Sequence, residues 1–125
     1  MNKNIFLVED DSAISDIYKT MIEKSGFSVE AFSLGQEVVK AVKSINTIEE
    51  APDIILLDLI LPDMNGIDIL KEIKSNEKLK NIKVFILTNQ SEVKFDQPDV
   101  KPDKIIIKAN ITPTQLVDVI KEELK

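Results

Sequence analysis

The sequence of 125 residues contains no cysteine, no histidine and no arginine, and each absence excludes a class of chemistry. Without cysteine, the chain has no disulfide, no thiol nucleophile and no cysteine-ligated metal site. Without histidine, it has no imidazole base, no histidine-zinc site and no phosphohistidine carrier. All 16 cationic side chains are lysines, so the bidentate contacts of arginine to phosphate or guanine are missing. At a net charge of −6 we expect no binding to nucleic acid.

Long apolar segments are absent as well. The N-terminus leads into only four apolar residues before Glu9, too few for the core of a signal peptide. No stretch approaches the roughly 20 apolar residues of a membrane span, so we expect a cytoplasmic protein with no membrane partner. The length suits one compact domain, and we expect residues 1–125 to form that single domain with no output domain.

Short apolar runs alternate along the chain with segments of helical periodicity. Four runs are continuous and mostly β-branched, as in strands that are covered on both faces. A fifth alternates between apolar and polar residues, as expected of an edge strand. In chain order the five runs are residues 5–8, 28–32, 54–57, 84–87 and 105–107.

Apolar residues at helical spacing mark four helices between and after these strands. They lie within residues 14–22, 34–42, 67–73 and 116–124. Gly26 is placed to end the first helix, Ser33 and Gln36 form a possible capping box for the second, and Thr112, Pro113 and Gln115 form a stronger one for the last.

The alternation predicts an α/β fold, a doubly wound parallel sheet with helices on both faces. One connection is weaker than the others. Residues 89–104 link the fourth and fifth strands, yet Val93 and Phe95 alternate, and Pro98 and Pro102 interrupt the segment. We therefore expect the helix at this place, the fourth in the fold, to be short or irregular.

The buried strands end in polar residues. In a parallel sheet these ends lie along one edge, the carboxyl edge, where open α/β folds bind their ligands. Four distant chain segments thus converge by topology alone. The converging side chains are Glu9, Asp10, Asp58, Thr88 and Lys108.

Carboxylates gathered at this edge repel one another. At about 5 Å and an effective dielectric constant of about 20, each pair costs roughly 3 kcal/mol. Lys108 can neutralise one charge, and the remainder suits Mg²⁺, which prefers one or two carboxylates, water and a phosphoryl oxygen. A metal, a lysine and a hydroxyl around one aspartate form a suitable site for transferring a phosphoryl group to a carboxylate.

Four motifs of this chain resemble those of the receiver domain of two-component response regulators. The motifs are Val8–Asp11, Asp58–Gly66, Leu87–Thr88 and Lys108. The resemblance runs the whole chain and is to the stand-alone, single-domain type. It implies a flavodoxin-like receiver fold with five strands in the order 2-1-3-4-5. It also implies that Asp58 accepts a phosphoryl group from a sensor histidine kinase or phosphotransfer protein, and that it contributes to the metal site.

The other roles that the resemblance implies follow position by position. Asp10 binds Mg²⁺ directly, and Glu9 is a second ligand or acts through a metal-bound water. Ile60 offers its backbone carbonyl to the metal. Thr88 hydrogen-bonds a phosphoryl oxygen, and Lys108 pairs with the phosphate. The downstream target would be a protein, recognised through protein–protein contacts.

Several neighbouring residues qualify these roles. Asp11 lies outside the usual acidic pair, and we interpret it as a helix cap. The family usually has proline after the lysine, in a cis peptide; here the residue is Ala109, for which trans is favoured. Ile105 replaces the family's switch aromatic. The residues that influence attack by water in this family are Ile60 and Gln90 here, and an apolar Ile60 predicts a long-lived phosphoryl group.

Two other functions fit parts of the pattern. One is a pseudo-receiver, an interaction module without phosphorylation, which Ile105 and Ala109 favour. The other is an aspartate-nucleophile phosphatase acting on external substrates. Such enzymes carry a second acid two residues beyond the nucleophile, where this chain has the apolar Ile60. In the leading hypothesis the domain catalyses only its own phosphorylation and dephosphorylation, and is not otherwise an enzyme.

Overall fold

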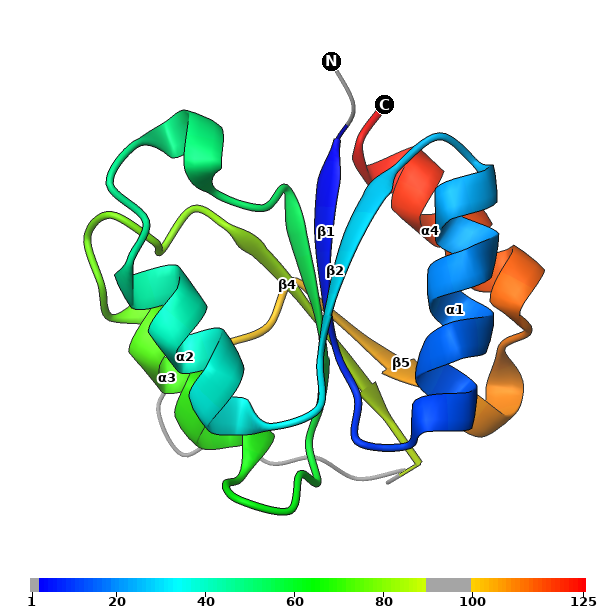
Figure 1. Ribbon diagram of the computed structural model, residues 1–125, viewed down its shortest axis with the longest axis horizontal. Coiled ribbons are helices and arrows are strands. Elements are labelled where there is room, and N and C mark those ends of the chain that lie inside the picture. Colours follow the sequence, from blue (N-terminus) through cyan, green and yellow to red (C-terminus); the bar gives the residue numbers. More distant parts are fainter. Residues whose placement is uncertain (1–2, 90–99) are drawn as a thin grey trace.

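The computed structural model of the protein describes residues 3–89 and 100–125. Five parallel strands form one sheet with helices on both faces (Figure 1). The strands are β1 (Asn4–Val8), β2 (Ser28–Phe32), β3 (Ile54–Asp58), β4 (Lys83–Thr88) and β5 (Lys104–Ile107). The helices are α1 (Ser12–Lys24), α2 (Gly35–Lys43), α3 (Gly66–Lys74) and α4 (Pro113–Glu123), with short 3₁₀ turns η1 (Ile48–Glu50) and η2 (Lys108–Asn110).

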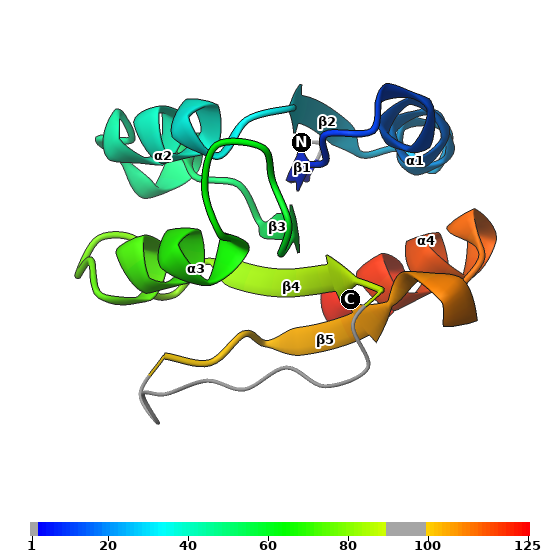
Figure 2. The same cartoon turned by 90° about the horizontal axis from the view of Figure 1, so that it is seen from below.

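The strand order is β2-β1-β3-β4-β5, which confirms the predicted topology. Helices α2 and α3 cover one face of the sheet, and α1 and α4 cover the other (Figure 2). Successive residues of β1 point to opposite faces, so that Phe6 joins the core under α2 and α3 and Leu7 joins the core under α1 and α4. Both faces of the central strands are therefore dry, as their continuous apolar runs predict.

The register of the strands places their carboxyl ends at one level. Val8 of β1 pairs with Leu57 of β3, so the residues that follow them, Glu9 and Asp58, are neighbours at the sheet edge. Residue Thr88 of β4 pairs with Ile107 of β5, the residue before the lysine. The sheet edge is thereby built from the predicted polar residues.

Three of the predicted helix ends are confirmed. Asp11 caps α1, because its Oδ1 accepts hydrogen bonds from the Ala13 and Ile14 amides at 3.0 and 3.1 Å. Gly26 follows α1 with a positive φ of 98°. Thr112 and Gln115 form the predicted capping box of α4, with donor–acceptor distances of 2.9 and 3.1 Å.

The predicted capping box of the second helix is wrong. Glu37, not Gln36, turns back to the chain before α2, and its Oε1 accepts from the backbone amides of Ser33 and Leu34, both at 3.1 Å. The reason is that α2 begins one residue later than that box requires, with Leu34 as its N-cap, so the third helical residue is Glu37.

The segment expected to hold a short or irregular helix between β4 and β5 falls mostly on residues 90–99, which lie outside the described residues, as does Gln90. The Lys108–Ala109 peptide bond is trans, as expected for a non-proline residue. Within residues 3–89 and 100–125, none of the helices has the length and apolar character needed to span a membrane.

Candidate functional site

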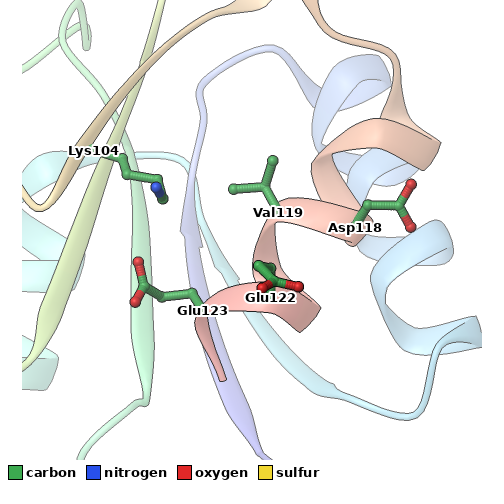
Figure 3. A pocket seen from close by; sticks show the side chains of 5 residues that line it. All are labelled: Lys104, Asp118, Val119, Glu122 and Glu123. Carbon is green, nitrogen blue, oxygen red and sulfur yellow. The ribbon is translucent and has the colours of Figure 1, made fainter. Parts of the chain in front are cut away.

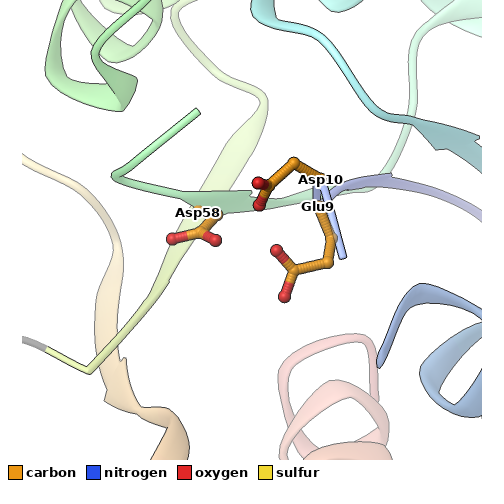
Figure 4. Close-up of side chains that lie close together, drawn as sticks. All are labelled: Glu9, Asp10 and Asp58. Carbon is orange, nitrogen blue, oxygen red and sulfur yellow. The ribbon is translucent and has the colours of Figure 1, made fainter. Parts of the chain in front are cut away.

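Three acidic side chains meet at the carboxyl edge of the sheet. Glu9 and Asp10 directly follow β1, and Asp58 is the last residue of β3. Figure 4 shows their carboxylates directed into the same space. One oxygen atom from each lies within 4.8 Å of the others. Glu9 and Asp58 are buried, whereas Asp10 is exposed, so the group opens to solvent on one side.

Lys108 is the cation of this edge. Its Nζ donates a hydrogen bond to Glu9 Oε1 at 2.6 Å and another to Asp58 Oδ2 at 2.9 Å. The lysine reaches the site because β5 ends at Ile107, beside the end of β4. The prediction that residues 10, 58 and 108 approach one another is therefore supported by the coordinates.

Burial gives these charges unusual proton affinities. The loss of solvation, followed by the adjacent Asp58 carboxylate, raises the pKa of Glu9 to about 7. Burial alone would lower the pKa of Lys108, but the hydrogen bonds and charges of the two carboxylates outweigh it and raise that pKa. The lysine is therefore charged at neutral pH, while Glu9 is poised to exchange a proton.

One buried atom of the site has an unused capacity to bind. Glu9 is only 3% exposed, and its Oε2 has no hydrogen-bond partner among the described residues. A buried carboxylate oxygen without a partner is costly. A hard divalent cation with oxygen ligands, held by Glu9, Asp10 and Asp58, would satisfy this atom and offset the repulsion among the acids. The donor set thus fits Mg²⁺.

The loop between β3 and α3 closes over the end of Asp58. The Ile60 amide lies 3.3 Å from Asp58 Oδ1, and Ile60 forms an isolated antiparallel bridge with Asn65. The Gly66 amide donates to the Leu59 carbonyl at 2.8 Å. A Cβ at Gly66 would lie 2.5 Å from the Asp58 carbonyl oxygen, so only glycine permits this approach.

The remaining predicted residues lie where the strand ends place them. Thr88 is buried at the end of β4. Ile60 is 63% exposed at the rim beside Asp58, and Ile105 is 43% exposed on β5. The roles of the Thr88 hydroxyl and the Ile60 carbonyl stay predictions.

Two residues near the site were missed by the sequence analysis. Tyr18 of α1 is buried in the core, and it also lines a pocket of about 400 Å³ that adjoins Lys108. Asp63, which the sequence analysis places only within the motif Asp58–Gly66, accepts hydrogen bonds from the start of α2. The sequence shows an acidic side chain directly after Pro62. It does not show the contact of this side chain with α2, because α2 is distant in sequence.

A larger hollow of about 460 Å³ lies elsewhere, between β5 and α4 (Figure 3). Lys104 of β5 and three acidic residues of α4 surround it. The acidic residues are Asp118, Glu122 and Glu123. None of the residues that converge at the carboxyl edge lines this hollow, so size alone does not identify the functional site.

Comparison with known proteins agrees with this geometry. The family model of the response regulator receiver domain matches residues 5–121. The chain belongs to this family. Among solved structures, the phosphorylated cyanobacterial phytochrome response regulator RcpA is 30% identical, with a TM-score of 0.79 over 98% of this chain and 91% of that one. The Mn²⁺-bound form of response regulator Rcp1 is 26% identical, with a TM-score of 0.75 over 96% and 92%.

Curated relatives of this receiver domain include longer proteins. The DNA-binding transcriptional regulator NtrC of Proteus hauseri is 36% identical over 72% of this chain, which covers 18% of NtrC. The polar-differentiation response regulator DivK of Brucella ovis is 31% identical over 70% of this chain and 68% of DivK. The chain thus spans a minor part of NtrC and most of DivK. By name, NtrC is a transcriptional regulator and DivK is a response regulator.

Proposed function

We propose that this receiver domain is a phosphoacceptor switch of a two-component phosphorelay. In this proposal Asp58 takes a phosphoryl group from a sensor histidine kinase or phosphotransfer protein, and the phosphorylated domain signals through contacts with a downstream protein. The single observation that carries the proposal is the position of Lys108. Its amine bridges Asp58 and Glu9 at the edge of a three-carboxylate cluster.

The proposed reaction is an in-line displacement at phosphorus. An oxygen of Asp58 attacks the phosphoryl group of a phosphohistidine, the new O–P bond forms, and the P–N bond breaks to leave the imidazole on the donor. Lys108 stands 2.9 Å from Asp58 Oδ2, close enough to pair with an oxygen of the arriving phosphoryl group. The Thr88 hydroxyl, at the end of the adjacent strand, is proposed to hydrogen-bond another such oxygen.

Mg²⁺ is the proposed cofactor. Its proposed ligands are the carboxylates of Asp10 and Asp58, the carbonyl of Ile60, and Glu9 directly or through water. When bound, the metal would neutralise charge on the phosphoryl oxygens. The unpartnered Oε2 of Glu9 supports a cation here, and the named Mn²⁺-bound form of Rcp1 supports a divalent metal in a related domain.

The limited catalytic role is part of the same proposal. The receiver domain is proposed to catalyse only its own phosphorylation and dephosphorylation. The similarity to the polar-differentiation response regulator DivK over 68% of that relative supports a role as a response regulator.

The test is direct phosphorylation. The protein is incubated with an acyl phosphate and Mg²⁺ and its intact mass is measured. We expect one added phosphoryl group that requires Mg²⁺ and is absent from Asp58→Asn. A matched control, Asp68→Asn, changes an exposed aspartate of α3 and should be phosphorylated like the wild type. No addition, or an addition that persists in Asp58→Asn, would overturn the proposal.

The second candidate is a pseudo-receiver that binds partners without phosphorylation. It is favoured by Ile105, which leaves an exposed aliphatic side chain on β5 in place of an aromatic ring. The phosphorylation experiment separates the two functions. A pseudo-receiver would gain no phosphoryl group, and it would show no rise in melting temperature when Mg²⁺ is added.

A further inference from the structure

The short segment that joins β2 to α2 contacts two other parts of the chain, the end of β1 at Glu9 and the loop between β3 and α3 at Asp63. We call residues 32–36 the β2–α2 junction. At one end, the Phe32 carbonyl accepts a hydrogen bond from the Glu9 amide at 3.0 Å. At the other end, the amides of Gly35 and Gln36 donate to the Asp63 carboxylate, to Oδ1 at 2.7 Å and to Oδ2 at 2.8 Å.

The loop that contains Asp63 needs such an anchor. Glu9 and Asp58 are held at a fixed spacing because β1 and β3 are paired up to Leu57. Ile60 lies two residues beyond the end of β3 and outside that ladder. Its bridge to Asn65 is a contact within the loop, so it fixes the shape of the loop but not its direction relative to the acidic pair.

Packing supports the same contact. A Cβ at Gly35 would lie 2.2 Å from Cγ of Met64, so the methionine sits directly against the backbone of the junction. Met64 also packs against the core beneath α2 and α3. Asp63 and Met64 thus hold two successive residues of the loop against the first turn of α2, one by hydrogen bonds and the other by apolar contact.

The hydrogen bonds to Asp63 are charge-assisted. Glu37 already satisfies the amides of Ser33 and Leu34, which leaves those of Gly35 and Gln36 for Asp63. The hydrogen bond from Gln36, together with that from Gly35, lowers the pKa of Asp63. Asp63 is therefore ionised at neutral pH and faces the positive end of the α2 dipole.

We propose that the β2–α2 junction is a bracket that sets the spacing between the Glu9–Asp10 pair and the backbone of Ile60, with Asp63 as its positioning residue. Asp63 acts through the loop and does not itself touch the acidic cluster. The inference rests on the proposed function, in which the Ile60 carbonyl is a metal ligand. It adds a residue that controls the geometry of that ligand from outside the site.

The test compares Asp63→Asn with Asp68→Asn. Both substitutions remove one negative charge near the start of α3, but the structure gives the Asp68 side chain no hydrogen bond among the described residues, so this variant is the matched control for charge. The first readout uses the metal-free protein: the exchange rates of the Ile60 and Gly66 amides by NMR. We expect about tenfold faster exchange in Asp63→Asn and no change in Asp68→Asn.

The second readout is the dissociation constant for Mg²⁺, measured by titration. We expect Asp63→Asn to bind about tenfold more weakly than Asp68→Asn, since residues that orient metal ligands change affinity by this order. Equal exchange and equal affinity in the two variants would overturn the inference. If the wild type binds no Mg²⁺, the proposed function fails, and the amide exchange still decides whether Asp63 anchors the loop.

A third variant guards against misfolding of Asp63→Asn. Gln36→Pro deletes one amide donor to Asp63 and keeps the aspartate charge. Residue 36 is the second residue of α2, so its amide makes no hydrogen bond within the helix that the proline would remove. Because one of two hydrogen bonds remains, we expect about threefold faster exchange at Ile60. Exchange at the wild-type rate in this variant would count against the bracket.

Discussion

The Nζ of Lys108 lies 2.6 Å from Oε1 of Glu9, nearer than the 2.9 Å to Oδ2 of the proposed phosphoacceptor, Asp58. The lysine is therefore shared between two buried acids and not reserved for one. A phosphoryl group on Asp58 would offer Lys108 new oxygen acceptors. These would compete with the hydrogen bonds that Lys108 now makes to Glu9 and Asp58.

Glu9 makes the stability of the metal-free protein depend on pH. Its pKa, raised to about 7 from 4.5, means that the folded state holds a proton that the unfolded state releases. Stability from this group is therefore present below the unfolded pKa and falls as the pH rises from about 4.5 to about 7, by an amount on the order of 3 kcal/mol. Urea denaturation across this range measures the effect.

The variant that tests this pH dependence is Glu9→Gln, which mimics the protonated acid at every pH. Its unfolding free energy should lose the part of the pH dependence that Glu9 causes, and the difference from the wild type should grow toward pH values of about 8. Glu23→Gln, which changes an exposed acid on α1, is the control for general charge effects. A difference between wild type and Glu9→Gln that is constant over the range would contradict the assignment.

Removing the lysine should leave two buried acids without their cation. We expect Lys108→Met to lower the unfolding free energy by about 3 kcal/mol at neutral pH, because breaking a buried ion pair exposes the cost of the remaining charges. Part of the loss should return at about pH 5, where protonation of Glu9 relieves the repulsion. Lys104→Met changes an exposed lysine at the start of β5, the strand that precedes Lys108, and should have a small effect. A Lys108→Met protein as stable as this control would refute the prediction.

Metal binding should stabilise the fold by an amount that rises with the logarithm of the metal concentration once that concentration exceeds the dissociation constant. At a concentration of Mg²⁺ about 100 times its dissociation constant, we expect about 2.7 kcal/mol of added stability. Asp10→Asn should abolish this gain and also raise the stability of the metal-free protein slightly, because one of three mutually repelling carboxylates is removed. Asp16→Asn, an exposed residue of α1, should keep the gain. Thermal denaturation with and without Mg²⁺ is the measurement.

The convergence of the site could be predicted from sequence, because parallel strands bring polar residues at their carboxyl ends to one edge. That rule placed Asp10, Asp58 and Lys108 together without any knowledge of side-chain conformations. The sharing of Lys108 with Glu9 depends on the path of a long flexible side chain, which no spacing encodes. The tie between Asp63 and α2 joins loops 28 positions apart, and local sequence rules do not reach that far.

The start of the second helix shows that local capping rules can miss a helix end by one residue. Ser33 and Gln36 have the residue types and the spacing of a capping box, yet the helix begins one position later and Glu37 takes the role. Glu37, directly after Gln36, competes for the same amides. The hydrogen bond from the Gln36 amide to Asp63 favours the helix start in which Glu37 is the capping acid. Tertiary contact, in this case, selects among locally equivalent helix starts.

Ile60 should prolong the life of a phosphoryl group on Asp58. Its side chain is exposed at the rim and apolar, so it cannot orient a water molecule for attack on phosphorus. In Ile60→Asn a polar side chain can do so, and we expect loss of the phosphoryl group to be about tenfold faster. Intact mass followed over time, after the phosphodonor is removed, measures the rate. Ile17→Asn, which changes another exposed isoleucine, on α1, is the control. Slower loss from Ile60→Asn than from the wild type would contradict the prediction.

Two glycines should respond to alanine for different physical reasons. At Gly66 a Cβ would lie 2.5 Å from the Asp58 carbonyl oxygen and 2.8 Å from Leu59 Cα, so the loop must move away from the end of β3. At Gly26 nothing lies within 4 Å, but the φ of 98° strains any residue with a Cβ. We expect each alanine to lower stability by about 1–2 kcal/mol. Only Gly66→Ala should also weaken Mg²⁺ binding and slow phosphorylation, because Ile60 moves with the loop; Mg²⁺ titrations that agree for the two variants would show that the loop position does not matter to the site.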